Sequence, residues 1–406
     1  MKRAVITGLG MVSPLGCDVE STLSALETGE SAVRRMEGWE RYIGLQSLVA
    51  APAELRGEKK IPRQKRRSMG RMSIFAVQAA EQAVADSGIS PGEDDAGRTG
   101  CIVGSTMGSS QSMNEAFESM LPERDLSNMT SMSFFQCVSH TAAMNVSNYF
   151  GITGIVMATS AACASGLQAI GAAYDLVRCG KQDAVICGGA EDLHPTVTGS
   201  FDVLFATSTH YNESPGRTPR PFDKERDGLV CGEGSGVIVV EDYERARARG
   251  AKIYAEITGY HTCGSGVHVS QSDSSTMVRC MKSAMDQAGI LPSDVDYISA
   301  HATGTTHGDA EEARAIRDLF GNTTPASSLK GQIGHTLGAS GAIELIASLK
   351  MAEKGELLPT FNLENVDPEC AGINHLQEKK AEPVRILLKN SFAFGGINAV
   401  LVCRRL

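Results

Sequence analysis

A repeated pair of segments sets the strongest limit on how this chain folds. The segment "SGLQAIGAAYDLVRCGKQ" at 165–182 aligns without gaps on "SGAIELIASLKMAEKGEL" at 340–357. A second echo occurs in the same order, between "AAEQAVADSGISPGEDD" at 79–95 and "MKSAMDQAGILPSDVD" at 281–296. Two amphipathic helices can resemble each other by chance, but two ordered echoes favour duplication of a strand–helix unit. We therefore expect two equivalent halves.

Runs of β-branched residues that end in glycine alternate with alanine-rich amphipathic stretches, such as 72–87 and 165–179. This alternation is typical of an α/β fold with strands and helices in layers. No linker rich in proline, glycine or serine divides the 406 residues. The sequence therefore predicts halves that are packed on each other.

Composition excludes several classes of function. The chain is 42% hydrophobic and 21% charged, as expected of an ordinary globular protein. A net charge of −9 argues against a general nucleic-acid binder. No stretch approaches the roughly 20 apolar residues of a membrane span, and the N-terminus is too short in apolar residues for a secretory signal. Eleven cysteines without framework spacing fit reduced thiols, so we expect a cytoplasmic protein.

Cys163 lies among residues with almost no side chain, in "ATSAACASGLQAIGAA", where a strand is expected to turn into a helix. A thiol at a helix N-terminus meets unpaired N–H groups and the positive end of the helix dipole, which favour thiolate. Small neighbours leave access for an acyl group and let backbone N–H groups point at a developing oxyanion. We interpret the segment as a nucleophile turn, although most cysteines are inert core residues.

Two histidines occupy similar junctions. His301 follows a β-branched run in "ISAHATGTTHGD", and His335 lies in a glycine-flanked turn in "KGQIGHTLGASG". Ligands of α/β sheets bind at the carboxyl ends of strands, so we expect both histidines to converge on Cys163 there. A metal site is the competing interpretation, but the spacing of structural zinc ligands is absent and we predict none.

Four separated motifs carry a resemblance over essentially the whole chain. They are "TSAACASG", "AHATGTTHGD", "SLKGQIGHTLGASG" and "NSFAFGGINAVLV", in this order. In these motifs the chain resembles the β-ketoacyl-acyl-carrier-protein synthases of type II fatty-acid and polyketide synthesis. The resemblance implies a thiolase fold, in which duplicated halves form a five-layer αβαβα sandwich. We expect the halves at 1–250 and 251–406.

The resemblance also implies a reaction and its residues. Cys163 would accept an acyl chain from acyl carrier protein, and malonyl carrier protein would then lose carbon dioxide and attack the thioester. No cofactor is implied beyond the phosphopantetheine arm of the carrier, and a homodimer or a heterodimer with a related subunit is expected. By this resemblance, His301 and His335 would donate hydrogen bonds to the malonyl thioester, and the Phe394 N–H would belong to the oxyanion hole. Thr303 and Thr305 would contact pantetheine. Lys330, paired with Glu312, and Asp309 would support the site.

Two further assignments follow from the same resemblance. The segment "RQKRRSMGR" contains five cations in an acidic chain: Arg63, Lys65, Arg66, Arg67 and Arg71. It is predicted to dock acidic carrier protein. The alternative is a solvated helix face, which is the usual fate of a charge run. Met107, in "VGSTMGSS", is predicted to line the acyl pocket, and Phe394 to act as a mobile gate beside the nucleophile.

Two rival readings remain. A non-decarboxylating thiolase needs a second cysteine near the C-terminal glycine-rich loop, but that loop reads "SFAFGGINA" and the nearest cysteine is Cys403. A chain-length-factor subunit usually lacks the nucleophile, whereas Cys163 and both histidines are present here. The acyl chain length and the pathway cannot be read from the sequence.

Overall fold

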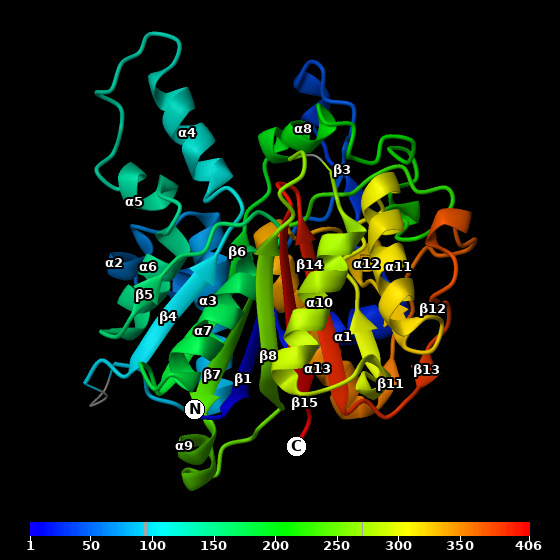
Figure 1. Ribbon diagram of the computed structural model, residues 1–406. Helices are drawn as coiled ribbons and strands as arrows, with labels where there is room; N and C mark the ends of the chain where they lie inside the picture. The colour runs from blue at the N-terminus through cyan, green and yellow to red at the C-terminus, as the bar shows by residue number, and fades with distance from the viewer. Residues whose placement is uncertain (93–95, 270) are drawn as a thin grey trace.

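A single mixed sheet of eleven strands runs through the molecule (Figure 1). The computed structural model describes residues 1–92, 96–269 and 271–406. The strand order is β12-β10-β9-β14-β15-β8-β1-β7-β6-β4-β5. In chain order the strands are β1 (Ala4–Val12), β4 (Thr99–Gly104), β5 (Val156–Met157), β6 (Ala184–Glu191), β7 (Gly234–Asp242), β8 (Ala255–Gly264), β9 (Tyr297–Ser299), β10 (Pro325–Ser327), β12 (Asn374–His375), β14 (Ile386–Ala393) and β15 (Ile397–Arg404).

The strand directions repeat in the two halves of this sheet. In the first half β5, β4 and β6 pair in parallel, while β7 pairs antiparallel with both β6 and β1. In the second half β10, β9 and β14 pair in parallel, while β15 pairs antiparallel with both β14 and β8. The halves join where β1 pairs antiparallel with β8. The predicted α/β class and its duplicated plan are confirmed, and the boundaries at 1–250 and 251–406 stay a prediction.

Helices cover both faces of the sheet, and two of them lie between its two halves. The longer ones are α1 (Val19–Thr28), α3 (Arg71–Ser87), α4 (Ser110–Met120), α6 (Thr141–Phe150), α7 (Ser165–Arg178), α8 (Pro195–Asp202), α10 (Ser274–Ala288), α11 (Thr306–Phe320) and α13 (Ser340–Lys354). α3 packs on β1, β7 and β6, whereas α10 packs on β8 and β15. α7 and α13, the helices of the longer echo, contact each other between the two halves. The other echo falls on α3 and α10, although its residues 93–95 lie outside the described residues.

The remaining elements are short. They are β2 (Arg34–Arg35), β3 (Val49–Ala50), α2 (Arg63–Arg66), α5 (Ser133–Cys137), α9 (Tyr243–Ala248), α12 (Lys330–Ile333), β11 (Glu356–Leu357) and β13 (Lys380–Ala381). α4 and α5 stand out from the body at the upper left of Figure 1. Within the described residues, no helix combines the length and the apolar character that crossing a membrane requires.

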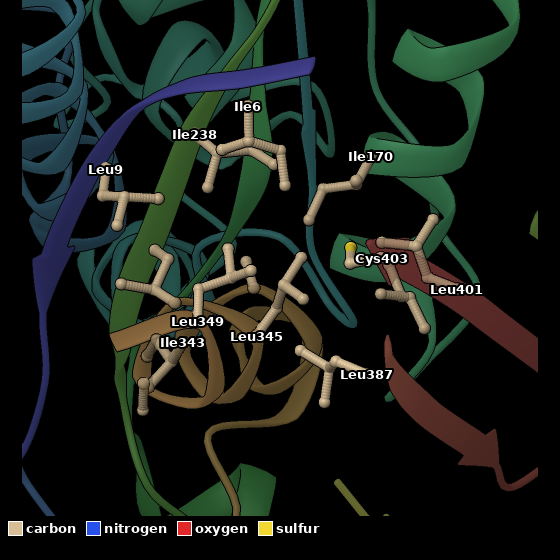
Figure 2. Packing of buried hydrophobic residues seen from close by; sticks show 14 of the residues in the cluster. Ile6, Leu9, Ile170, Ile238, Ile343, Leu345, Leu349, Leu387, Leu401 and Cys403 are labelled. Carbon is tan, nitrogen blue, oxygen red and sulfur yellow. The ribbon is translucent and has the colours of Figure 1, made fainter. Parts of the chain in front are cut away.

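The largest core lies around α13 (Figure 2). Ile343, Leu345 and Leu349 of this helix are buried together with Ile6 of β1 and Leu387 of β14. Burying such side chains contributes roughly 1.5–3 kcal/mol each relative to leaving them exposed. The helices approach closely because small residues lie between them: a Cβ on Gly166 would stand 2.5 Å from the Gly338 carbonyl oxygen. This packing brings the segments before α7 and α13 together.

Candidate active site

Cys163 lies in a tight turn between β5 and α7. Ala162 before it has a left-handed backbone with φ of 47°, a conformation that only a small or unhindered residue adopts at low cost. The Ser165 hydroxyl holds the turn, since it accepts from the Ala161 N–H at 2.8 Å and donates to the Ala162 carbonyl at 2.6 Å. The run of small residues around the cysteine is therefore explained by the turn and by the close helix packing.

The two histidines converge on this cysteine as predicted. His335 Nε2 lies 2.9 Å from Cys163 Sγ. The rings of His301 and His335 are 5.2 Å apart between centroids and nearly perpendicular, at 80°. All three residues line one cavity of about 230 Å³. They come from three loops, which follow β5, β9 and α12.

Both histidines are neutral in this environment. Burial lowers the pKa of His301 and that of His335 well below the usual range, and the nearby Lys330 cation adds to the effect. The Leu337 N–H donates to His335 Nδ1 at 3.3 Å, so the ring proton of His335 lies on Nε2. That N–H points at the sulfur. A neutral imidazole of this tautomer is a hydrogen-bond donor for charge that develops beside Cys163.

Opposing effects act on the Cys163 thiol. Burial raises its pKa to about 12, against the opposing effects of Lys330 and of hydrogen bonds from the backbone N–H groups of Cys163 and Phe394. Burial thus opposes the thiolate that the helix N-terminus is expected to favour, and the thiolate at Cys163 stays a prediction. The same two N–H groups face the sulfur, and their role as the oxyanion hole stays a prediction.

Two buried carboxylates shape the loop that carries His301. Glu312 accepts from the backbone N–H groups of His301 and Ala302 at 2.8 and 2.6 Å. Asp309 accepts from those of Thr303 and Gly304 at 2.9 and 3.2 Å. Four successive N–H groups are thus bound by two side chains of α11. Burial raises the pKa of Asp309 to about 6 and also raises that of Glu312.

Lys330 pairs with a different glutamate from the one expected. Its Nζ lies 2.6 Å from Oε1 of Glu344, and Nζ of Lys389 lies 2.6 Å from Oε2 of the same residue. The predicted pair with Glu312 is wrong because that carboxylate is occupied by backbone N–H groups and by Asn390 Nδ2. Glu344 and Lys389 were missed. Each is the lone charge in an apolar run, "SGAIELIASL" and "ILLKNSF", and this signal could have identified them.

Thr303, Thr305 and Phe394 line the same cavity. The two threonine hydroxyls lie 3.1 Å apart, and the Phe394 ring packs against Phe201 with centroids separated by 5.8 Å. Sequence reasoning did not identify Phe205, which also lines the cavity, is 95% exposed and has a left-handed backbone with φ of 54°. A non-glycine residue held in this way at the rim of a site is a candidate for substrate contact.

Met107 does not line this cavity. It follows β4, and its side chain is 42% exposed in the single chain. The neighbouring Thr106 N–H donates to the buried carboxylate of Glu191 at 2.8 Å. The assignment of Met107 to the acyl pocket stays a prediction.

The basic segment forms α2 and the start of α3, and its cations differ in their surroundings. Arg63 and Arg67 are exposed. Lys65 donates to the Tyr149 carbonyl at 2.5 Å, and Arg66 donates to that of Glu58 at 2.9 Å. Arg71 forms an ion pair with the buried Glu233 at 2.6 Å, so its role there is structural.

Cys163, His301 and His335 also satisfy the geometry of a three-ligand metal site, because one ligand atom of each lies within 4.8 Å of the others. Thiolate and imidazole would suit a soft or borderline cation such as zinc. The same three groups are the ones that a thiol-based acyl transfer requires. The prediction that the site holds no metal stays a prediction.

Comparisons with known proteins decide the family. Residues 1–246 match the model for the N-terminal domain of β-ketoacyl synthases, and residues 254–364 match that for their C-terminal domain. The chain belongs to the β-ketoacyl synthase family. It is 38% identical to the 3-oxoacyl-[acyl-carrier-protein] synthase 1 of Escherichia coli K12, with all of both chains covered.

Solved structures agree with this family. A β-ketoacyl synthase from Burkholderia phymatum STM815 superposes with a TM-score of 0.96 at 44% identity, again over all of both chains. The ketosynthase of a type II polyketide synthase, solved in complex with its acyl-carrier protein, gives 0.91 at 31% identity, with 100% of this chain and 99% of that one covered. Members of this family are acyltransferases that form carbon–carbon bonds, and the thiolase fold expected from the sequence is confirmed.

Proposed function

We propose that this chain is a β-ketoacyl-acyl-carrier-protein synthase that lengthens an acyl chain by two carbons. The observation that carries the proposal is a buried thiol beside two neutral histidines, with His335 Nε2 at 2.9 Å from Cys163 Sγ. The names of the relatives agree with this reaction, including the E. coli synthase that matches over its full length.

The first step is transfer of an acyl group to Cys163. The sulfur attacks the thioester carbonyl of the acyl carrier, its proton passes to the departing pantetheine sulfur, and acyl-Cys163 and free carrier thiol result. The backbone N–H groups of Cys163 and Phe394 stabilise the oxyanion of this step. Transfer through a neutral thiol suits a site in which burial disfavours a resting thiolate.

The second step is decarboxylative condensation. The carboxylate of malonyl carrier leaves as carbon dioxide, and its electron pair moves into the thioester to form an enolate. Neutral His301 and His335 donate hydrogen bonds to the enolate oxygen. The enolate carbon then attacks acyl-Cys163, a carbon–carbon bond forms, and the Cys163–acyl bond breaks. The Cys163 thiolate released in this step takes up a proton from solvent as the 3-oxoacyl carrier leaves.

The rival thiolase reaction is disfavoured by the cavity. Cys163 is the only cysteine among its lining residues in the described part of the chain. Cys403, the candidate from the sequence, is buried in β15 opposite Ile257. Without a second thiol to move a proton, decarboxylation is the route to the carbanion that this site supports.

The test combines mass spectrometry with product analysis. Purified protein mixed with an acyl carrier substrate should gain one acyl mass on Cys163, and malonyl carrier should discharge it as a 3-oxoacyl product. His301→Ala and His335→Ala should still become acylated. Each should release carbon dioxide more slowly by a factor on the order of 10²–10³, as expected for loss of one donor to developing charge. Acylation without condensation in the unaltered protein would instead support a chain-length-factor or transfer role. The same assay after treatment with a chelator should show no loss, because the reaction needs no cofactor.

We also propose that acidic carrier protein docks on Arg63 and Arg67. These are the exposed cations of the basic segment. Arg63 begins α2, and Arg67 directly follows it and lines a cavity with Gln64 and Ser68. A relative of known structure binds its acyl-carrier protein. Complementary charge of this kind raises the rate of encounter and is screened by salt.

Pairing with a second copy or a related subunit is proposed from the free edge of the sheet. β5 is one of the two edge strands, and Val156 and Met157 are 43% and 42% exposed there. An edge strand with apolar side chains is a template for pairing with another chain. Light scattering on the purified chain should give twice the chain mass for a homodimer; a monomer that doubles only with a second subunit would indicate a heterodimer. All eleven cysteines are free thiols, which supports a cytoplasmic location.

A further inference from the structure

Two cysteines outside the active site lie together between β8 and α10. Cys263 is the penultimate residue of β8, and Cys280 lies on the second turn of α10. Cys263 Sγ reaches the Thr276 carbonyl of α10 at 4.0 Å, while Cys280 Sγ reaches the His261 carbonyl of β8 at 3.4 Å. Each thiol thus contacts the backbone of the element that carries the other. Cys263 and Cys280 therefore lie near each other where α10 packs on β8.

The pair is asymmetric in exposure. Cys280 is fully buried, whereas Cys263 is partly exposed at the edge of the same apolar cluster. The neighbouring Cys280 thiol lowers the pKa of Cys263, and Arg279 and His261 act in the same direction. The pKa of Cys280 is raised by the same contact and by burial. An accessible thiolate with a buried thiol as its neighbour is the usual arrangement of an attacking and a resolving cysteine.

Other cysteines of the chain lack these properties. Cys101 and Cys187 lie on neighbouring strands, but both are fully buried and burial raises the pKa of each thiol. Cys179 is exposed, in the turn after α7. It therefore serves as an internal reference for an ordinary accessible thiol.

We propose that Cys263 and Cys280 form a reversible disulfide when the protein meets hydrogen peroxide. The Cys263 sulfur attacks the peroxide, so a sulfur–oxygen bond forms, the oxygen–oxygen bond breaks, and water leaves. The Cys280 sulfur then attacks the sulfenic sulfur, and its proton leaves with the hydroxyl as a second water. Overall, two thiols are oxidised and one peroxide is reduced to two waters. A dithiol reductant reverses the reaction by exchange.

The position of the pair links it with the active-site cavity. Beyond Cys263, the Ser265 N–H donates to the Gly396 carbonyl at 2.8 Å, and the Gly395 N–H donates to the Val269 carbonyl at 2.8 Å. Met277 lies one helical turn before Cys280 and lines the cavity. The disulfide would connect β8 with α10. Ser265 and Val269 lie between these two elements and hydrogen-bond to the loop after Phe394. The modification itself does not depend on the proposed reaction.

The sequence allows a direct test by peptide mapping. Trypsin cleaves after Lys252, Arg279 and Lys282, so Cys263 and Cys280 fall on separate peptides, 253–279 and 280–282. After peroxide treatment of the whole protein and quenching with an alkylating agent, a linked 253–279/280–282 species should appear and should vanish on reduction. The proposal is overturned if Cys263 accumulates as sulfinic acid or stays reduced under conditions that oxidise Cys179.

Two substitutions at one position separate cross-linking from activation. Cys280→Ser keeps a hydrogen-bond donor but cannot form the disulfide, whereas Cys280→Ala removes both functions. At pH 7 iodoacetamide should alkylate Cys263 equally fast in the unaltered protein and in Cys280→Ser. In Cys280→Ala alkylation should be about three- to fivefold slower, because the lost thiolate fraction is partly offset by higher intrinsic nucleophilicity. Equal rates in all three proteins would contradict the contact between the two thiols. Cys179 alkylation gives the reference rate of an exposed thiol, and protection of the buried Cys101 reports whether each variant is folded alike.

Discussion

Glu344 bridges two buried cations, and its removal should expose how strongly the site depends on them. We consider Glu344→Gln, which keeps the shape of the side chain but removes its charge. Glu344 is 1% exposed, and each carboxylate oxygen lies 2.6 Å from a lysine Nζ, of Lys330 or of Lys389. Removing one partner of a buried ion pair typically costs about 3–5 kcal/mol, since the other charge is left without compensation.

The pKa of lysine sets an independent limit on this loss. A lysine that loses its partner can release its proton, which costs about 1.4 kcal/mol for each pH unit below its usual pKa of about 10.4. At pH 7.5 this limit is about 4 kcal/mol for one lysine, in agreement with the range above. Lys389 is the candidate, because burial already lowers its pKa.

The loss of stability in Glu344→Gln should depend on pH in a predictable direction. In Glu344→Gln, a lysine that is neutral when folded takes up a proton on unfolding, so the free energy of unfolding rises with pH. The difference in free energy of unfolding between Glu344→Gln and the unaltered protein should narrow by about 1.4 kcal/mol per pH unit between pH 7.5 and 9.5. Urea denaturation at one protein concentration measures the gap at each pH.

The matched control lies on the same helix. Glu353 of α13 pairs with Lys350 at 2.7 Å near the surface, and Glu353→Gln should cost no more than about 1 kcal/mol with little dependence on pH. Equal losses in the two variants, or a gap for Glu344→Gln that does not change with pH, would refute the reasoning that buried lysines carry the cost.

Three further predictions concern the reaction. Reversal of two charges in Arg63→Glu/Arg67→Glu should lower kcat/KM for carrier-bound substrates about tenfold and flatten its dependence on salt. Turnover of acyl-pantetheine substrates should not change, and the control variant Lys181→Glu/Arg385→Glu should behave like the unaltered protein. An equal loss with both kinds of substrate would remove the docking proposal. Because burial raises the pKa of Cys163 to about 12, its alkylation by iodoacetamide should rise about tenfold per pH unit from 7 to 9, and a plateau within that window would show a resting thiolate. Met107→Phe should exclude long acyl primers from Cys163 and Met107→Gly should admit more lengths, whereas an unchanged length profile in both variants would show that Met107 does not face the acyl chain.

The fold and the convergence of three residues in one cavity could be predicted from the sequence because both leave local signals. A duplicated helix recurs as a run of similar residues, which made α7 and α13 visible before their contact was known. Cys163, His301 and His335 lie in glycine-rich turns where strands or helices end, and these turns are short enough to be read directly. Each signal lies within about twenty residues.

The partners of charged groups could not be predicted in the same way. Lys330 meets Glu344, 14 positions along the chain, and Glu344 also meets Lys389 from a strand of the second half. The choice between Glu312 and Glu344 depends on which carboxylate is free after backbone N–H groups have been satisfied, and that depends on the conformation of the loop at 301–304. The same limit applies to Cys263 and Cys280, whose contact requires the packing of α10 on β8.

The balance of charge around Cys163 explains why its histidines act as donors. Lys330 and Lys389 contribute two positive charges, and Glu344 and Glu312 contribute two negative ones, all in the buried region. Glu312 is directed at backbone N–H groups, and the Lys330 cation lowers the pKa of both imidazoles. An imidazolium beside the thiol would favour a resting thiolate–imidazolium pair, as in cysteine proteases, and would expose the thiolate to other electrophiles. Neutral rings instead leave the sulfur protonated until an acyl group is placed against it, and they remain able to donate hydrogen bonds when the enolate forms. Burial thus serves both steps, since it raises the pKa of the thiol in the first and keeps the imidazoles neutral in the second.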